Sequence, residues 1–580
     1  MPIPAPLTEL PIKTDDGGYY EGFNRMVTIG GKAILAALVV WALVFPGHAA
    51  VALGAIQSFV MTNFSVWYMV VMGSFFLVSF GLALWPAAGR MKLSSHGEEP
   101  EFSSFSWFSM MFSAGIGVGM LTYATAEPMY HFQNNPEVIK GLATGATLEN
   151  VASGAPADNV RSAYKWSFLH WGVTAWCCYS LIGLSLAFFS YRRNLPLTIR
   201  SGIAPIFGKS LSGVFGNIVD ITAVVATILG VAVTLGVGVN QFASAIFKIT
   251  GWESLLNDLG EPVAPVIIIS IVIIMALSTL SALSGVGKGI KWLSNTNMAL
   301  SMFVLLFLIV FGSTAFAGKA LLFGLWDYIT NFPEMMLTKW TADGNADSVD
   351  SKLAGWQGGW TIFYWAWWVA FAPFVGLFLA RVSRGRTLRE FVIGSAIVPG
   401  LMCFVWFTVA GGTAIDLELS GAAAGKILSA PPTQQLFETM GVLLSPTLAW
   451  MMWMTIFILL LTYLVTTVDS AILIVNTINA AGDPAPKKPI HIISWGIALG
   501  LVMASLLLLT QTDADGNTIS GLKALNSAMI VGALPFSAVM LLMCGALVKA
   551  VYRDAQREKH GLPTTVGEMG HPAEVAQPAE

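Results

Sequence analysis

Four tryptophans stand close together in the segment from Trp360 to Glu390, WTIFYWAWWVAFAPFVGLFLARVSRGRTLRE, which ends abruptly in basic residues. Within it, Trp365, Trp368 and Phe371 recur every third residue, so a helix would place their rings along one side. Such rings can be ordinary packing or part of an interfacial belt. Their faces can also bind a cation, which is the usual way in which proteins recognise quaternary ammonium groups. The spacing alone leaves both interpretations open.

A second aromatic set lies upstream in HWGVTAWCCYS. A helix would put Trp176 and Tyr179 on one side, with Trp171 about a turn and a half earlier. His170, next to Trp171, is predicted to be a hydrogen-bonded structural group rather than a proton carrier.

Oxygen-bearing side chains stand out in YLVTTVDS, from Tyr463 to Ser470. Asp469 is a carboxylate deep in an apolar run, and such residues are functional candidates by default. Thr466 and Thr467 offer neutral hydroxyl oxygens, which suit sodium together with carbonyl groups freed where a helix unwinds. The alternative is that the threonines bond back to their own helix while Asp469 caps a neighbouring one.

Two apolar segments are expected to be interrupted. Pro373 removes a helical hydrogen bond, so the freed backbone should face protein or a water-filled cavity. The stretch AGIGVGM, from Ala114 to Met120, alternates glycines, which indicates either a backbone that lines a cavity or a tight contact between helices.

The elements that must position these groups are membrane helices. Of 580 residues, 55% are hydrophobic and only 11% are charged, less than half the usual charged fraction. The net charge of −3 says nothing about nucleic acid, but no dense basic patch with interleaved aromatic residues is present, so no nucleic-acid partner is expected. No phosphate-binding loop, zinc-spaced cysteine set or catalytic triad stands out, so neither an enzyme nor a resident cofactor is expected. The acidic N-terminus is expected to lack a cleavable signal peptide.

The lengths of the apolar runs predict an all-α integral membrane protein with twelve transmembrane helices. The predicted spans are residues 27–45, 66–86, 107–130, 163–190, 216–247, 264–283, 298–318, 358–380, 390–411, 448–476, 490–510 and 523–549. Long polar loops are expected at 131–162, 319–357 and 412–447, all on the outer side. The stretch from Gly285 to Asn295 is predicted to be a short interfacial helix on the cytoplasmic side.

The distribution of basic residues predicts that both termini are cytoplasmic. When the loops are assigned alternately, the inner ones carry about three times as many lysines and arginines as the outer ones. The expected organisation is a disordered cytoplasmic lead at 1–25, a twelve-helix membrane domain at 26–550 and a cytoplasmic tail at 551–580.

The two interrupted segments divide most of the chain into halves, helices 3–7 and helices 8–12. An odd number of crossings in each half inverts the second half relative to the first. Corresponding broken helices in inverted halves are the best sequence indication of a transport site near the membrane midplane.

The chain closely resembles the betaine/choline/carnitine transporter (BCCT) family from about residue 20 to 555, through the motifs FSMMFSAGIGVGM, FLHWGVTAWCCY, GVGKGIKWLSNTNM, WTIFYWAWWVAFAPFVGLFLARVSRGRTLREF and TTVDSA. The resemblance implies a leucine-transporter-type inverted five-helix repeat over helices 3–12. It also implies a homotrimer in the lipid bilayer of the cell (inner) membrane. Members of the family carry onium compounds by sodium or proton symport, and some are sodium-independent exchangers.

The same resemblance implies that seven aromatic side chains hold or admit the substrate: Trp171, Trp176, Tyr179, Trp365, Trp367, Trp368 and Phe371. Of these, Trp365 and Trp367 would lie along the access path. Phe371 stands where sodium-coupled glycine betaine carriers have tryptophan, and a phenyl ring lacks the indole N–H donor and some cation–π strength. This difference leaves room for a differently shaped onium substrate, such as a sulfonium.

Sodium is the coupling ion that the resemblance implies. One family site would use backbone and hydroxyl oxygens at five positions: Ser113, Ile116, Tyr463, Thr466 and Thr467. The second family site needs two hydroxyl groups one turn apart. This chain has Thr227 and Phe374 at that site, but Val231 replaces the second hydroxyl and cannot donate an oxygen.

The sequence therefore predicts a secondary transporter that imports a betaine, choline, carnitine or dimethylsulfoniopropionate type of compound. Sodium symport through alternating access is the expected mechanism. A sodium-independent exchanger is the alternative that Val231 favours and that Thr466 and Thr467 disfavour. An onium-binding sensor is disfavoured because the cytoplasmic segments contain no output domain.

Overall fold

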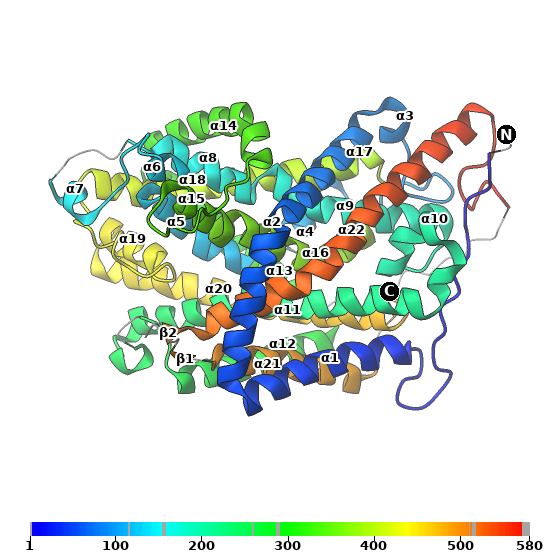
Figure 1. Ribbon diagram of the computed structural model, residues 1–580, viewed down its shortest axis with the longest axis horizontal. Helices are drawn as coiled ribbons and strands as arrows, with labels where there is room; N and C mark the ends of the chain where they lie inside the picture. The colour runs from blue at the N-terminus through cyan, green and yellow to red at the C-terminus, as the bar shows by residue number, and fades with distance from the viewer. Residues whose placement is uncertain are drawn as a thin grey trace.

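The computed structural model describes residues 3–113, 117–153, 158–257, 260–285, 291–485, 487–509, 511–512 and 518–570. Over these residues the protein is helical, apart from turns and loops and from one antiparallel pair of two-residue strands, β1 (Gln511–Thr512) and β2 (Thr518–Ile519). Figure 1 shows α7 (Leu148–Ser153), α19 (Gln435–Leu443) and these strands at one end, and α3 (Pro86–Gly89), α10 (Ala204–Phe207) and the N-terminus at the other.

Eleven helical segments of the described residues are long and apolar enough to cross a membrane. They are α1 (Arg25–Val44), α2 (Pro46–Leu84), α8 (Val160–Trp171) with α9 (Val173–Arg193), α11 (Val214–Thr250), α12 (Ala264–Ser284), α13 (Lys291–Phe311), α15 (Val349–Gln357) with α16 (Phe363–Arg381), α17 (Leu388–Val392) with α18 (Val398–Leu419), α20 (Pro446–Asn479), α21 (Pro489–Leu507) and α22 (Gly521–Lys559). The remaining predicted span corresponds to α4 (Ser104–Ser113) and α5 (Gly117–Gln133), and residues 114–116 between them lie outside the described part. The prediction of a multi-span all-helical membrane protein is confirmed.

The helix α2 is much longer than the span predicted at 66–86. Its 39 residues correspond to roughly 58 Å, about twice the thickness of a bilayer core, so it must be strongly inclined or protrude. Its first half was missed because polar residues such as Gln57 and Asn63 interrupt the apolar run. The helix α22 also has 39 residues, and the two pack side by side (Figure 1).

The loop predicted at 319–357 is mostly helical. It contains α15 and the greater part of α14 (Thr314–Leu337), which packs against α8 and α18. The polar residues that suggested a loop lie on this helix, and Asp327 pairs there with Arg161 of α8. The outer connection at 131–162 holds the short α6 (Pro136–Ile139) and α7, and the one at 412–447 holds the end of α18 and α19.

Helix interruptions occur at glycines and at two π-helical turns. Gly172 separates α8 from α9, and a Cβ there would lie 2.3 Å from the carbonyl oxygen of Phe168, so only glycine fits. The helix α16 continues through Pro373, contrary to the expected break at that residue. Its irregular turn lies earlier, at Gly358–Ile362, and a second π-helical turn at Ile393–Ile397 joins α17 to α18.

The packing of the two halves is reciprocal. When the helices of each half are matched in order, α9 against α16 corresponds to α18 against α5, and both pairs are in contact. In the same way α11 contacts α16 and α22, while α20 contacts α5 and α13. The two helices α11 and α20, which correspond to each other, also pack together. This exchange of partners is the pattern that the expected two-fold repeat requires.

One smaller expectation is wrong, and another lies partly outside the described residues. The lead at 1–25 is not disordered over residues 3–24, because Glu21 pairs with Lys488 and the Tyr19 carbonyl contacts His491. Part of the interfacial helix predicted from Gly285 to Asn295 lies outside the described residues, and positions 291–295 already belong to α13.

Candidate functional site

A small cavity of about 30 Å³ lies between α5, α8, α9, α11 and α16. It is lined by Gly119, Trp171, Tyr179, Thr234, Trp367, Trp368 and Phe371. Five of the seven aromatic residues proposed from the sequence therefore surround one space, although they come from three helices. A cavity of this size holds about one water molecule, so the site is contracted.

The five aromatic residues that line the cavity are here called the aromatic box. Hydrogen bonds donated by two of its indole groups fix the box. Trp368 donates its Nε1–H to the backbone oxygen of His170 at 3.1 Å, just before the break between α8 and α9. Trp367 donates its Nε1–H to Oγ1 of Thr234 at 3.1 Å, which ties α16 to α11. The ring orientations are thereby determined by neighbouring helices as well as by α16 itself.

Trp368 is central among the rings of the aromatic box. Its ring centroid lies 4.7 Å from that of Tyr179 and 5.8 Å from that of Trp171, with the Trp171 ring nearly perpendicular. The Tyr179 and Phe371 centroids are 6.4 Å apart. No charged side chain lines the cavity among the described residues. The arrangement can hold a compact cation against ring faces, but it offers no charged partner for an anionic group.

Trp176 and Trp365 do not line the cavity. The Trp176 ring lies behind the aromatic box, 5.6 Å from both Tyr179 and Trp368. Trp365 is fully buried and packs edge-on against His170, with centroids 6.1 Å apart. Two residues of helix turn a side chain by about 200°, so Trp365 faces away from Trp367. The described structure thus brings these two residues near the site without placing them at the cavity.

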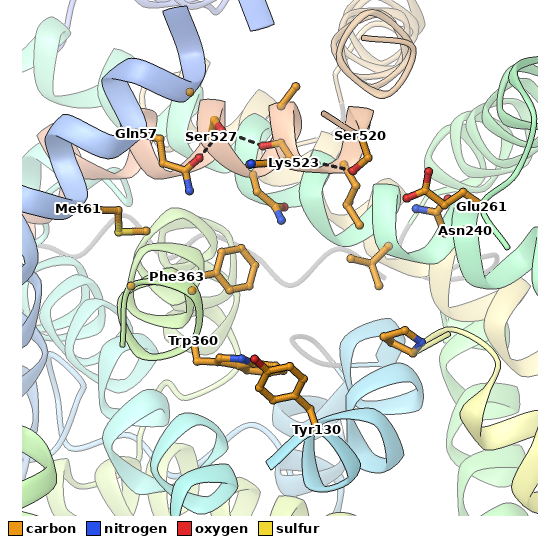
Figure 2. Close-up of a pocket in the computed structure, with 18 of the residues that line it drawn as sticks. Gln57, Met61, Tyr130, Asn240, Glu261, Trp360, Phe363, Ser520, Lys523 and Ser527 are labelled. Carbon is orange, nitrogen blue, oxygen red and sulfur yellow. Dashed lines mark hydrogen bonds between the residues drawn. The ribbon is translucent and has the colours of Figure 1, made fainter. Parts of the chain in front are cut away.

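A much larger open pocket of about 1160 Å³, here called the vestibule, lies beside the box. Figure 2 shows Gln57, Lys523 and Ser527 on one side of it, and Trp360 and Tyr130 on the other. It is lined by the N-terminal parts of α2 and α22, by Thr122, Tyr123 and Tyr130 of α5, and by the turn that precedes α16. The vestibule therefore lies at the starts of α2 and α22, far from the N-terminal segment and from the residues that follow α22.

A thin aromatic layer separates the vestibule from the box. Tyr123 and Phe363 line the vestibule, and their ring centroids lie 5.9 and 5.7 Å from that of Trp367, which lines the box. A movement of these three rings would connect the two spaces. The structure therefore combines a large vestibule with a narrow box.

The first proposed sodium site is only partly described. Ile116 and the side chain of Ser113 lie outside the described residues. Thr466 and Thr467 each donate a hydroxyl hydrogen bond to the Tyr463 carbonyl, at 3.2 and 2.9 Å, as the structural alternative predicted. A hydroxyl group that donates retains lone pairs, and one on Thr466 accepts from Asn297 at 2.9 Å. These residues keep oxygens available for a cation.

The second proposed sodium site contains an unsatisfied oxygen. Oγ1 of Thr227 is buried and has no hydrogen-bond partner, which is unusual for a buried hydroxyl group. Val231, one turn later on α11, is also buried and offers no oxygen. Phe374 lies on α16, which packs against α11, with its ring 5.1 Å from that of Phe371. Thr227 fits an ion ligand, whereas Val231 does not.

Asp469 connects two helices. Its Oδ2 accepts a hydrogen bond from Ser281 at 2.6 Å near the end of α12, and Oδ1 accepts one from Ser470 at 3.0 Å. Both partners are serine hydroxyl groups rather than backbone groups at a helix end, so Asp469 does not cap a neighbouring helix as the alternative predicted. Asp469 contributes to the packing of α20 against α12.

A buried carboxylate next to the aromatic box was not singled out from the sequence. Oε2 of Glu127 on α5 accepts hydrogen bonds from the Trp171 indole at 2.6 Å and the Tyr364 hydroxyl at 2.5 Å. Its Oε1 is within 2.7 Å of Nδ1 of His170 and 3.2 Å of Nε2 of His131. The side chains of Glu127, His131 and His170 are fully buried. The available signal was a glutamate inside the predicted span 107–130, which is costly in a membrane.

The same cluster has the composition of a metal site. Ligand atoms of Glu127, His131 and His170 lie within 4.8 Å of one another. Both histidine nitrogens that face the carboxylate, however, are engaged in hydrogen bonds to it. A metal ion would have to replace these bonds, so the geometry fits a hydrogen-bonded network better. His170 is accordingly a hydrogen-bonded group, as expected.

Comparison with known proteins gives matches over nearly the whole chain. A family model described as BCCT, betaine/carnitine/choline family transporter, matches residues 26–556. The glycine betaine transporter OpuD of Bacillus subtilis (strain 168) is 36% identical over 530 residues, which cover 91% of this chain and 94% of OpuD.

Two choline transporters of Acinetobacter baylyi also match. The osmo-independent choline transporter BetT1 is 33% identical over 533 residues, covering 90% of this chain and 93% of BetT1. The osmo-dependent choline transporter BetT2 is 32% identical over 566 residues, covering 96% of this chain and 76% of BetT2. All three relatives are transporters, which agrees with the expectation that the chain is not an enzyme.

Proposed function

The chain belongs to the betaine/carnitine/choline transporter family, and we propose that it imports a small quaternary ammonium or tertiary sulfonium compound through the aromatic box. The observation that carries the proposal is the convergence of five aromatic side chains on one cavity without a charged lining residue. An onium head cannot donate N–H hydrogen bonds, so ring faces are its natural ligand. The names of the relatives, a glycine betaine transporter and two choline transporters, support this substrate class.

The proposed orientation places both termini in the cytoplasm and the protein, as a homotrimer, in the cell inner membrane. The excess of lysine and arginine in the loops on the terminal side supports this orientation. With this orientation the vestibule opens to the outside. The substrate would enter between Trp360 and Gln57, pass the layer formed by Tyr123, Phe363 and Trp367, and reach the box.

The proposed mechanism is alternating access. The contrast between an open vestibule of about 1160 Å³ and a box of about 30 Å³ supports at least one conformational step, because the present box is too small for a trimethylammonium group. Trp367 is the ring that would move first, since it belongs to the box and contacts both vestibule rings.

Sodium is the proposed coupling ion. Thr466 and Thr467 supply the hydroxyl pair of one site, and the unsatisfied Thr227 hydroxyl supports a second, weaker site. Sodium prefers such hard neutral oxygens together with carbonyl groups. Only one site has a complete hydroxyl pair, so we propose a single tightly coupled sodium ion per cycle.

A sodium-independent exchanger is the second candidate, and Val231 is the specific observation that favours it. Against it, position 231 holds valine and not a basic residue, so no side-chain charge at this position replaces the missing sodium ion. The two candidates differ in one property, because only a symporter accumulates its substrate when sodium is the sole gradient.

The substrate class is tested by uptake into cells that express the protein. Labelled glycine betaine, choline, carnitine and dimethylsulfoniopropionate would each be offered in sodium buffer, with cells lacking the protein as control. Saturable uptake of at least one onium compound is expected. Uptake of none of them, with the protein present in the membrane, would refute the proposed substrate class.

A further inference from the structure

Glu127 carries a buried charge for which the described residues offer no cationic side chain. Its two ion-pair contacts are with His131 and His170, and neither lysine nor arginine reaches it. Four groups approach its two oxygens, and with both facing imidazole nitrogens carrying their proton all four donate, which satisfies an ionised carboxylate.

The hydrogen bonds indicate that both histidines are neutral. Nδ1 of His131 is buried without a partner, so a second proton on that ring would be unsatisfied. Nε2 of His170 lies 3.0 Å from the hydroxyl group of Thr361. Among the described residues, this nitrogen is the one acceptor within reach of the Thr361 hydroxyl group. Each histidine therefore donates one proton to Glu127 and keeps none for the other nitrogen. The network as a whole carries one negative charge.

This charge is coupled directly to the wall of the box. The Trp171 indole donates to Glu127 with its nitrogen, while its far edge, at Cη2, would lie 3.0 Å from a Cβ at Gly119, which lines the cavity. Tyr364, the second donor to Oε2, packs against both Trp171 and Trp367, with centroid distances of 5.6 and 5.9 Å. Two rings bonded to the carboxylate thus stand beside the substrate cavity.

We propose that Glu127 is the counter-charge for the cationic head of the substrate and acts through Trp171. A carboxylate that accepts the indole N–H increases the electron density of the ring, which strengthens its attraction for a cation. The negative charge also attracts that cation across a low-dielectric interior. Glu127 does not line the cavity. It acts on the substrate through Trp171, so it is a positioning residue and does not contact the substrate. The inference rests on the proposed onium substrate.

The test compares an onium compound with its uncharged-head isostere. The isostere of glycine betaine is 3,3-dimethylbutanoate, and that of choline is 3,3-dimethylbutan-1-ol. For dimethylsulfoniopropionate the isostere is 4-methylpentanoate, and for carnitine it is 3-hydroxy-5,5-dimethylhexanoate. Whichever onium compound is transported defines the pair, and inhibition of its uptake gives a binding constant for each member. The preference for the onium head over the carbon head is the measured ratio.

In Glu127→Gln we expect this ratio to fall about tenfold, with the constant for the isostere unchanged within about twofold. A purely structural role would weaken both compounds together, and that result would overturn the inference, as would an unchanged ratio. Glu137→Gln is the matched control. Glu137 also accepts an indole N–H, that of Trp166 at 2.7 Å, but it lies away from the cavity, so the ratio should not change.

A second comparison holds if Glu127→Gln does not fold. Trp171→Phe and Trp367→Phe each remove one indole from the box, but only Trp171 donates to a carboxylate, whereas Trp367 donates to Thr234. The ratio should fall more in Trp171→Phe than in Trp367→Phe, and equal falls would overturn the inference. If the wild-type protein does not prefer the onium head, the proposed function fails as well; if it does and Glu127→Gln keeps that preference, only this inference fails.

Discussion

At the scale of the residue, recognition depends on which ring faces reach the cavity. Trp368 contacts the rings of Trp171, Trp176 and Tyr179 and lines the cavity itself. Trp365, three residues earlier, belongs to the same helix but lies behind it. The two tryptophans are therefore a matched pair for testing whether the aromatic box binds the substrate.

Trp368→Phe is expected to raise the KM for the onium substrate about three- to tenfold, because tryptophan is the best cation–π partner and the effect is worth about 0.5–2 kcal/mol. Trp365→Phe should change the KM by less than twofold. Initial rates of uptake, corrected for the amount of protein in the membrane, give both values. Equal effects of the two substitutions would show that the cavity is not the substrate site.

The hydroxyl groups of α20 make a second prediction at this scale. Combined Thr466→Ala and Thr467→Ala should raise the sodium concentration for half-maximal uptake at least tenfold, because two neutral oxygen ligands are lost. Thr462→Ala removes a hydroxyl group one turn earlier that bonds only to backbone oxygens of its own helix, and it serves as the control. Sodium activation that is the same in all three proteins would contradict the assignment.

Much of the site was predictable because aromatic residues in apolar segments have few roles. Periodicity identified the side of α16 that carries Trp368 and Phe371 and the second aromatic set with Trp171 and Tyr179, and the family resemblance added Trp367. Neither the periodicity nor the resemblance could show that Trp365 and Trp176 lie behind the cavity, because that depends on which side of each helix packs against its neighbours. Glu127 was missed because its partners come from α5, α8 and α16, far apart in the sequence.

At the scale of the element, the glycines of α5 allow a ring to lie against its backbone. A Cβ at Gly117 would lie 1.9 Å from the ring of Tyr463 on α20. The hydroxyl group of Tyr463 is held by Ser301 at 2.6 Å, so the ring cannot move aside without losing that hydrogen bond. The glycine stretch makes a close helix contact at Gly117 and lines the cavity at Gly119, so both interpretations left open apply to it.

Gly117→Ala is accordingly expected to reduce uptake at least tenfold, because the added methyl group forces α5 and α20 apart where the first sodium site is proposed. Gly81→Ala in α2 is the control, since nothing lies within 4 Å of its Cβ position. The measurement is sodium-dependent uptake per amount of protein in the membrane. Uptake by Gly117→Ala at the wild-type level would contradict the close packing described here.

Hydropathy predicted the helices that are apolar all round and failed for those with a polar face. The helix α14 was taken as a loop because Lys319, Asp327 and Glu334 lower its mean hydropathy. The first half of α2 was lost for the same reason, and its Gln57 in fact lines the vestibule. In the folded protein the polar residues of these helices form an ion pair or line a pocket, and a single sequence does not show such contacts.

At the scale of the whole molecule, a buried ion cluster joins α22 to α9 at the end of the protein where the N-terminal segment lies. Asp554 contacts Arg192 at 3.3 Å and also Arg193, and its side chain is fully buried. Thr564, after the end of α22, bonds to both arginines. The residues after α22 are therefore part of the folded body up to the end of the described chain.

Asp554→Asn should lower the Tm of the detergent-solubilised protein by several degrees. Removing one member of a buried ion cluster leaves buried charges unpaired and costs about 3–5 kcal/mol. Glu558→Gln breaks the exposed contact with Arg90, which is worth about 0–1 kcal/mol, so its Tm should stay close to that of the wild type. A Tm for Asp554→Asn equal to that of Glu558→Gln would contradict the structural role of the cluster.

The proposed coupling to one sodium ion would set the scale of accumulation. One charge crossing 100 mV supplies about 2.3 kcal/mol, which corresponds to a substrate gradient of roughly fiftyfold. A zwitterionic substrate adds no net charge, so sodium would carry all of this energy. A cation without a carboxylate would add its own share.

The central claim, an onium transporter driven by sodium, is tested most directly by accumulation in proteoliposomes. Purified protein would be reconstituted, and the substrate identified by uptake would be supplied at equal concentration on both sides, with a sodium gradient as the only driving force. Net accumulation inside, abolished when potassium replaces sodium, is the predicted result. No net accumulation, together with equal exchange of labelled substrate in both salts, would show an exchanger and contradict the account.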